Sequence, residues 1–238
     1  MVNAIQEREQ HSLLNRGAQI TPRLEKFFQI VGQQGALRFD QVQRWFGYYS
    51  PEPIRMKEAT QLSAERTRKI LHPWFEQEWF SYRVFFAKQK GWLWLTPKGI
   101  KATGLTLRYY EPSPAVLPHL YAVNEIRLLL ATRRPADCWR SERELRAEYA
   151  LSKRHLPDAE LLTEKGTINA LEVELTLKSE KRLQEILVDL ASNARYATIW
   201  YFAPEAIAVA LRKALRTLPQ ERRHQFRFYN LQGKEYAS

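Results

Sequence analysis

Apolar side chains in the first half of the chain recur at helical spacing in separate segments. The first segment runs from Pro22 to Gln34, with Thr21 as a start signal and Gly35 as its end. A second, shorter helix is expected from about Asp40 to Phe46, with Gly47 as its stop. The pattern therefore predicts two helices in succession.

A third helix is predicted after Ser63, which is a suitable N-cap residue. Pro73 is expected to kink or end this helix, because proline lacks the backbone N–H that a helix interior uses. The basic residues Arg66, Arg68 and Lys69 are left facing outward. The inward face is predicted to consist of Thr67, Ile70, Leu71 and Trp74.

Two β-prone runs follow, Ser81–Ala87 and Trp92–Leu95, on either side of the Gly-containing segment 88–91. They predict a β-hairpin whose tip carries two lysines. Thr96 and Pro97 then provide an N-cap and a first helical residue for one more short helix.

Positive charge gathers in the same region. The chain has a net charge of +11, which favours association with polyanions. If the surface were only generically basic, the excess positive charge would be spread evenly along the chain. Between Arg66 and Lys101, however, the only acidic residues are Glu76 and Glu78. The basic residues of this stretch are Arg66, Arg68, Lys69, Arg83, Lys88, Lys90, Lys98 and Lys101.

The order helix, helix, helix, hairpin, helix, with Leu95-Thr-Pro-Lys-Gly99 after the hairpin, resembles bacterial winged helix-turn-helix domains. The resemblance implies a DNA-binding domain over residues 1–110, with the third helix in the major groove and the wing on phosphates. An alternative is a winged helix that binds protein. The predicted contacts with double-stranded DNA are Arg66, Arg68, Lys69, Arg83, Lys88 and Lys90.

Three prolines within residues 111–118 indicate a semi-rigid linker, and residues 119–238 form the second predicted domain. Its pattern of helices and strands predicts a mixed sheet flanked by helices, so the whole chain is assigned to a two-domain α/β class. The predicted elements are helices at 119–133, 141–149, 180–193 and 204–215, and strands at 196–202 and 226–229.

Between these elements lies a further hairpin with candidate chemistry. Asp158 opens one strand, a turn follows at Glu164-Lys-Gly166, and the second strand carries Glu172, Glu174 and Lys178. On one continuous strand these last residues would share a face, and Asp158 would meet Glu172 across the ladder. Paired carboxylates suit a divalent cation, although a charged, solvated strand face is the alternative.

This segment resembles the core of the PD-(D/E)xK nuclease superfamily, with Pro157-Asp158 and Glu172 at its first two acidic positions. The resemblance implies that Asp158 and Glu172 bind a metal such as Mg²⁺. The superfamily places a Lys two residues later to orient the attacking water, but this chain has Glu174 there. Lys178 shares the face but lies roughly 20 Å from Glu172 along a straight strand, so only a bend could bring it back.

More narrowly, the chain is similar to bacterial replication-relaxation and mobile-element proteins, which join a winged helix to a nuclease-like domain. Catalytic candidates are Asp158, Glu172, Glu174 and Lys178. His155 is a candidate proton shuttle, and Glu125 is a candidate ligand from the preceding helix; both can equally be incidental.

Three functions follow. The first is a DNA-binding accessory or regulatory protein of a plasmid or mobile element, acting in replication, transfer or transcription control, with a degenerate nuclease-like domain. The second is a Mg²⁺-dependent endonuclease, and the third is a structural adaptor in a replication or transfer complex. The missing Lys favours the first over the second. Partners beyond DNA include a second copy of the chain or the replication or transfer machinery.

The remaining composition points to a cytoplasmic protein. No run of 18 or more apolar residues is present, so no membrane span or membrane partner is expected. Cys138 is the single cysteine, which excludes an internal disulfide and a cysteine-rich zinc site.

Overall fold

The computed structural model describes residues 20–49, 61–151 and 154–237. The chain divides into two compact units, Met1–Pro114 and Ala115–Ser238. The described residues combine helices with a three-stranded and a five-stranded sheet, which is the predicted mixed α/β class.

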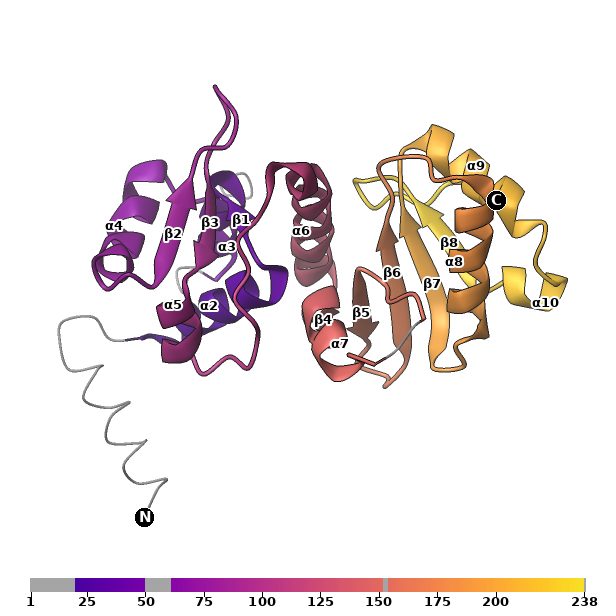
Figure 1. Ribbon diagram of the computed structural model, residues 1–238, viewed down its shortest axis with the longest axis horizontal. Coiled ribbons are helices and arrows are strands. Elements are labelled where there is room, and N and C mark those ends of the chain that lie inside the picture. Colours follow the sequence, from indigo (N-terminus) through magenta and orange to yellow (C-terminus); the bar gives the residue numbers. More distant parts are fainter. Residues whose placement is uncertain (1–19, 50–60, 152–153, 238) are drawn as a thin grey trace, which may run out of the picture. The chain divides into compact units, whose positions relative to one another are not determined.

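The N-terminal unit is built from four helices and a small antiparallel sheet of strand order β1-β3-β2 within its described residues (Figure 1). Phe28 lies at its centre, with its ring 5.1 Å from Trp74 and 5.7 Å from Trp79. The elements are α2 (Pro22–Gln34), β1 (Leu37–Arg38), α3 (Phe39–Tyr48), α4 (Ala64–Glu76), β2 (Phe80–Arg83), β3 (Trp92–Leu95) and α5 (Pro97–Ala102).

Most predicted helix boundaries in this unit are confirmed. Thr21, Ser63 and Thr96 accept hydrogen bonds from the first turns of α2, α4 and α5 through their side chains. Gly35 ends α2 with a positive φ of 84°. Gly99 allows a close approach, because a Cβ there would lie 2.2 Å from the carbonyl oxygen of Trp79.

Two residues expected to end helices lie inside them. Pro73 does not end α4, because the helix continues to Glu76 and buries the Trp74 ring against the core. Gly47 does not stop α3 either, since it is buried within the helix, which runs on to Tyr48. In both helices, packing of the last turn outweighs the low helix propensity of proline or glycine.

The hairpin has a shorter ladder than predicted and a longer tip. Arg83 pairs with Trp92, so β2 ends at Arg83 and Val84–Ala87 lie beyond the ladder. The tip bends between Phe86 and Gln89, whose backbone groups are joined by a hydrogen bond of 3.2 Å. Figure 1 shows this hairpin projecting from the rest of its unit.

The C-terminal unit is a five-stranded mixed sheet of strand order β4-β5-β6-β7-β8. The first three strands are antiparallel, and β7 and β8 run parallel to β6. Its elements are α6 (Leu117–Arg133), β4 (Cys138–Ser141), α7 (Glu142–Glu148), β5 (Ala159–Leu162), β6 (Ile168–Val173), α8 (Glu180–Ser192), β7 (Tyr196–Phe202), α9 (Glu205–Leu215), α10 (Gln220–Arg223) and β8 (Phe226–Tyr229).

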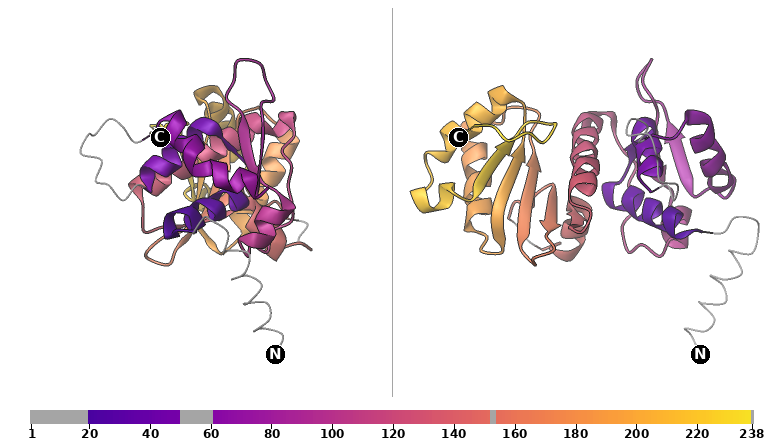
Figure 2. Two further views of the ribbon diagram at one scale, coloured as in Figure 1. Left: turned by 90° about the vertical axis from the view of Figure 1, so that its left-hand side faces the viewer. Right: turned by 180° about the vertical axis from the view of Figure 1, so that it is seen from behind.

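Helices cover both faces of this sheet. On one face α6 packs Val123 and Ile126 against Leu171 and Val173 of β6. On the other face α8 and α9 enclose a second core. Figures 1 and 2 show α6 on one side of the sheet and α8 and α9 on the opposite side.

The predicted elements of this unit are largely confirmed, with small shifts. The capping box at Ser141 starts α7, and β7 and β8 have the predicted bounds. Pro204 is the N-cap of α9 rather than its first residue. Within the segment predicted as a linker, a 3₁₀ turn covers Pro114–Val116, and α6 begins two residues before the predicted His119.

A buried carboxylate ties three strands together on the face that α8 and α9 cover. Glu160 of β5 is 1% exposed. It accepts hydrogen bonds from Arg140 of β4 at 3.2 Å, from Arg195 at 3.0 Å and from the Tyr196 hydroxyl at 3.0 Å. Permanently charged guanidinium groups therefore compensate its burial.

Replacing Glu160 by Ala should destabilise the protein strongly, because Arg140 and Arg195 would lose their shared buried partner. Removing one member of a buried ion pair costs about 3 to 5 kcal/mol, and urea unfolding measures this loss. The matched control is Glu164→Ala in the exposed β5–β6 turn, with an expected change within about 0.5 kcal/mol. Equal effects of both changes would contradict the structural role of Glu160.

Candidate functional site

The acidic candidates lie where β5 begins and β6 ends. Ala159 pairs with Leu171, so Asp158 stands next to the Glu172 end of the ladder, as predicted. The Oδ2 of Asp158 accepts a hydrogen bond from the Val173 backbone N–H at 2.8 Å. This bond fixes the carboxylate against β6.

Glu172 is buried, with 6% exposure, and pairs in parallel register with Tyr201 of β7. Its Oε1 lies 2.6 Å from the Nε2 of His155. The pKa of Glu172 is raised to about 7, chiefly by burial and also by the negative charge of Asp158, while His155 and Lys178 act in the opposite direction. His155, a candidate from the sequence, therefore contacts the cluster directly.

The prediction of one straight strand through Lys178 is wrong. β6 ends at Val173, and the Glu174 N–H donates to the carbonyl of Phe202 at 2.9 Å, after which the chain leaves the sheet. Leu177, in this segment beyond β6, is 65% exposed. The chain bends because the β6–β7 ladder stops at Phe202, so no partner strand holds residues 175–178 straight.

This bend returns Lys178 to the acidic cluster. Its ammonium binds the Oε2 of Glu174. Burial lowers the pKa of Lys178, while the charges of Glu172 and Asp158 raise it. The separation of Lys178 from Glu172 expected along a straight strand does not apply, and all four catalytic candidates belong to one cluster.

A second histidine was missed by the sequence analysis. His119, in the first turn of α6, places its Nε2 3.0 Å from the Oδ1 of Asp158. This hydrogen bond raises the pKa of His119 although burial lowers it. The sequence analysis named Glu125 as the candidate ligand from this helix. Glu125 lies six residues after His119, about 9 Å further along the helix axis. Only the packing of α6 on β5 and β6 could identify His119, since the sequence places it 39 residues from its partner.

Tyr201 adds a buried phenol to the cluster. Its hydroxyl has no hydrogen-bond partner within the described residues. Burial raises its pKa well above the usual value, and the charges of Glu172 and Asp158 add to this shift. The proton therefore stays on the phenol, a buried donor on the strand next to Glu172.

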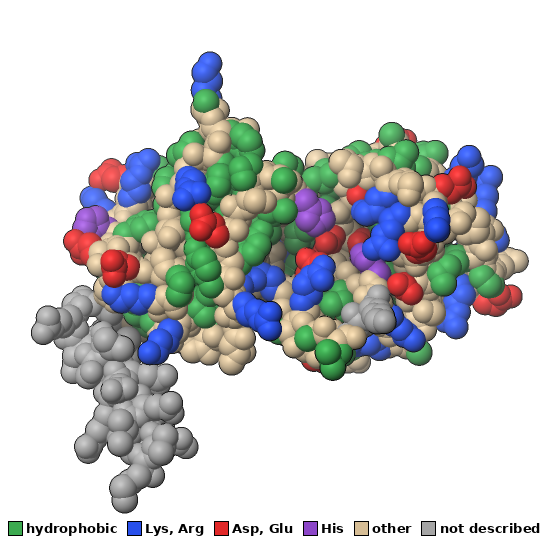
Figure 3. Space-filling model, viewed as in Figure 1, with side chains coloured by type: hydrophobic (Ala, Val, Ile, Leu, Met, Phe, Trp, Pro, Cys, Tyr) green, Lys and Arg blue, Asp and Glu red, His purple; other side chains and the backbone are tan. Residues whose placement is uncertain are grey.

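The side chains of this cluster can be compared with the ligands that a metal ion requires. Among residues 20–49, 61–151 and 154–237, no group of three or more His, Cys, Asp or Glu side chains is arranged to hold an ion. The predicted pair of Asp158 and Glu172 offers oxygen donors of the kind that Mg²⁺ prefers. An ion held by both would compete with His119 and His155 for the same carboxylates. Figure 3 shows acidic, basic and histidine side chains close together on one face of this unit.

The cationic candidates lie on the N-terminal unit. Arg66, Arg68 and Lys69 are exposed on α4, as predicted, while its predicted inner residues Thr67, Leu71 and Trp74 are buried. Ile70, the fourth of these, is half-buried. Lys69 forms an exposed ion pair with Glu65 at 2.8 Å.

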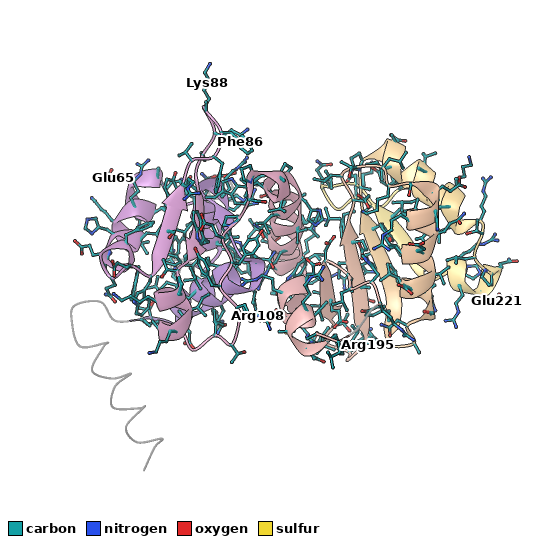
Figure 4. The ribbon with its side chains drawn as sticks, in the orientation of Figure 1. Glu65, Phe86, Lys88, Arg108, Arg195 and Glu221 are labelled. Carbon is teal, nitrogen blue, oxygen red and sulfur yellow. The ribbon has the colours of Figure 1, made fainter. Side chains whose placement is uncertain are left out.

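The hairpin residues Arg83, Lys88 and Lys90 are exposed too. Arg83 pairs with Glu111 at 3.1 Å, and the Nζ of Lys90 donates to Gln43 of α3 at 3.2 Å. Lys88 has a positive φ of 62° in the tip turn, and Figure 4 shows it pointing away from the unit. The tip charge is therefore presented to solvent.

Aromatic contacts connect α4 to the hairpin. The Arg68 guanidinium lies 5.5 Å from the Phe39 ring centroid, and that ring is 6.2 Å from Tyr82 on β2. Phe39 therefore stands between the exposed face of α4 and the base of the hairpin. The exposed basic residues of these two elements are together called the cationic surface: Arg66, Arg68, Lys69, Arg83, Lys88 and Lys90.

Comparisons with models of protein families, with curated proteins and with solved structures found no match. None of the described helices is both long and apolar enough to cross a membrane.

Replacing Glu172 by Gln should reduce the dependence of stability on pH. The unfolded chain ionises Glu172 near 4.5 and the folded protein only at about 7, so the unfolded state binds fewer protons between these values. The free energy of unfolding must therefore fall as the pH rises, by on the order of 1 to 3 kcal/mol from this group. The raised pKa of His155 acts in the same direction, because its stabilisation is lost above pH 6.5.

Urea unfolding of the parent and of Glu172→Gln at about pH 5 and about pH 8 measures this effect. The control is Glu185→Gln, an exposed glutamate on α8, which should keep the parental pH dependence. An unchanged pH dependence in Glu172→Gln would show that the folded protein does not hold the Glu172 proton.

Proposed function

We propose that this protein binds duplex DNA as an accessory or regulatory protein of a bacterial plasmid or mobile element. The observation that carries the proposal is the cationic surface, in which all six predicted DNA contacts are exposed and lie on α4 and the adjacent hairpin. Such a surface attracts phosphates through charge and counterion release.

The element order of the N-terminal unit supports a winged helix-turn-helix. In this assignment α4 enters the major groove and the β2–β3 hairpin is the wing. Ser63 caps α4, and its buried Thr67, Leu71 and Trp74 anchor it, so its basic face stays outside. The wing then supplies Lys88 and Lys90 to phosphates.

The topology of the C-terminal unit supports a PD-(D/E)xK-like core. One helix precedes three antiparallel strands, then α8 leads to β7, which is parallel to β6. We propose that its acidic cluster is a degenerate active site. Each carboxylate already has a partner within the protein, and the Lys178 ammonium is bound to Glu174 instead of being free to orient a water.

Removing basic side chains from the wing should weaken DNA binding and its salt dependence together. Each phosphate contact contributes about 0.9 to the slope of log K against log salt concentration, so Lys88→Ala with Lys90→Ala should lower the slope by about 2. Fluorescence anisotropy with a mixed-sequence duplex over a salt series measures the slope.

The control for this experiment is Lys165→Ala, an exposed lysine in the β5–β6 turn of the other unit. It should leave the slope unchanged. Weak binding by the parent that does not respond to the wing substitutions would instead favour a structural adaptor.

A metal-dependent endonuclease is the second candidate, and the bend after Val173 favours it. That bend brings Lys178 back to Glu172 and Asp158, which partly replaces the Lys missing at position 174. Mg²⁺ held by Asp158 and Glu172 would act as a Lewis acid toward a phosphate oxygen. Lys178 would then stabilise negative charge, and His119 or His155 would hold a proton near the cluster.

A plasmid-nicking assay with Mg²⁺ or Mn²⁺ separates the two candidates. The accessory role predicts no nicking above background and no difference between the parent and Asp158→Ala. Nicking by the parent that falls by about a hundredfold or more in both Asp158→Ala and Lys178→Ala would establish the endonuclease. The control is Lys181→Ala, an exposed neighbour in the first turn of α8.

A further inference from the structure

The first arm of the β2–β3 hairpin exposes apolar side chains at alternate positions. Tyr82, Val84 and Phe86 are 46%, 52% and 38% exposed. The residues between them turn the other way: the Phe85 ring is 6.1 Å from Trp94, and the Arg83 guanidinium lies 5.6 Å from the Phe85 ring. One edge of the arm is therefore packed, and the opposite edge faces solvent.

Tyr82 has a structural use at the base of the hairpin. Its hydroxyl accepts a hydrogen bond from the Gly91 N–H at 3.1 Å, and its ring contacts Phe39. Val84 and Phe86 lie beyond the ladder, nearer the tip, where they add little to the fold of the unit. We call these two residues the apolar edge.

Positive charge lies beside the apolar edge at the hairpin tip. Lys88 follows Phe86 in the tip turn, whereas the Arg83 side chain turns to the opposite edge and pairs with Glu111. Figure 4 labels Phe86 just below Lys88 on the projecting hairpin, and Figure 3 shows a basic side chain at the tip above exposed apolar ones. The hairpin thus presents one cation at its tip next to the apolar edge.

We propose that the apolar edge contacts the sugars and base edges of the DNA minor groove while Lys88 binds the flanking phosphates. The groove offers both kinds of partner, because charged backbones border a floor of sugars and base edges. Apolar wedge residues in other minor-groove proteins partly unstack a base step. This inference rests on the proposed DNA binding and adds to it a contact that does not depend on charge.

Other occupants fit this edge less well. Two side chains present far less apolar area than the amphipathic faces that hold proteins on membranes. They also fall far short of the roughly 800 Å² that each partner buries in a stable protein interface. The neighbouring Lys88 ammonium favours a polyanion.

The test separates the apolar contribution from the charged one by the salt dependence of binding. Phe86→Ala should weaken binding to a mixed-sequence duplex by about tenfold at every salt concentration, with the slope of log K unchanged. Phe86→Leu should restore most of the affinity, and Val84→Ala should weaken it by about threefold. Lys88→Ala should instead lower the slope by about one.

The chain offers a matched control for Val84. Val209 on α9 is 58% exposed against 52% for Val84, so Val209→Ala removes the same atoms from a similarly exposed site. It should leave DNA binding unchanged. Thermal unfolding monitored by circular dichroism checks that every variant folds like the parent.

The inference and the proposed function fail in different ways. No duplex binding by the parent overturns both. Parental binding that Phe86→Ala leaves unchanged, or that Val209→Ala weakens equally, overturns the inference alone. Loss in Phe86→Ala of binding to phosphatidylserine vesicles, or of self-association in sedimentation, with duplex binding retained, would assign the edge to lipid or to a second copy and overturn it as well.

Discussion

The antiparallel register of β5 and β6 places two carboxylates side by side in a poorly hydrated part of the C-terminal unit. Because Ala159 pairs with Leu171, Asp158 comes to the level of Glu172, and the Asp158 carboxylate is held there by the Val173 N–H. Burial and the negative charge of Asp158 disfavour ionisation of Glu172 and raise its pKa. His119, His155 and Lys178 gather around the pair because it requires compensating positive charge.

The two buried glutamates of this sheet are compensated in different ways. Glu160 is held by Arg140 and Arg195, whose charges are permanent at any physiological pH. Glu172 is paired with His155, whose charge changes near neutral pH. The first arrangement keeps its charges over the physiological pH range, whereas the second can change its charge near neutral pH.

The N-terminal unit separates its aromatic and its basic residues. Phe28, Trp74 and Trp79 pack against one another, and this packing orients α4 so that Arg66, Arg68 and Lys69 face solvent. The same unit ends its hairpin ladder early, at Arg83, and leaves a long tip that carries both charge and apolar surface. The exposed basic residues and the apolar edge therefore lie where core packing and strand pairing end, and the proposed DNA contacts depend on both.

The sequence by itself determined the elements whose signals are local. Helix starts at Thr21, Ser63 and Thr96 could be predicted because one side chain caps the following turn, and strand Tyr196–Phe202 could be predicted from its apolar run. The proximity of Asp158 to Glu172 also followed, since the turn at Gly166 sets the register of their hairpin. Only the tertiary structure decided the end of β6 at Val173, the return of Lys178 and the contact of His119 with Asp158. These depend on where a neighbouring strand stops and where a distant helix packs, and such long-range contacts leave no periodic trace in the chain.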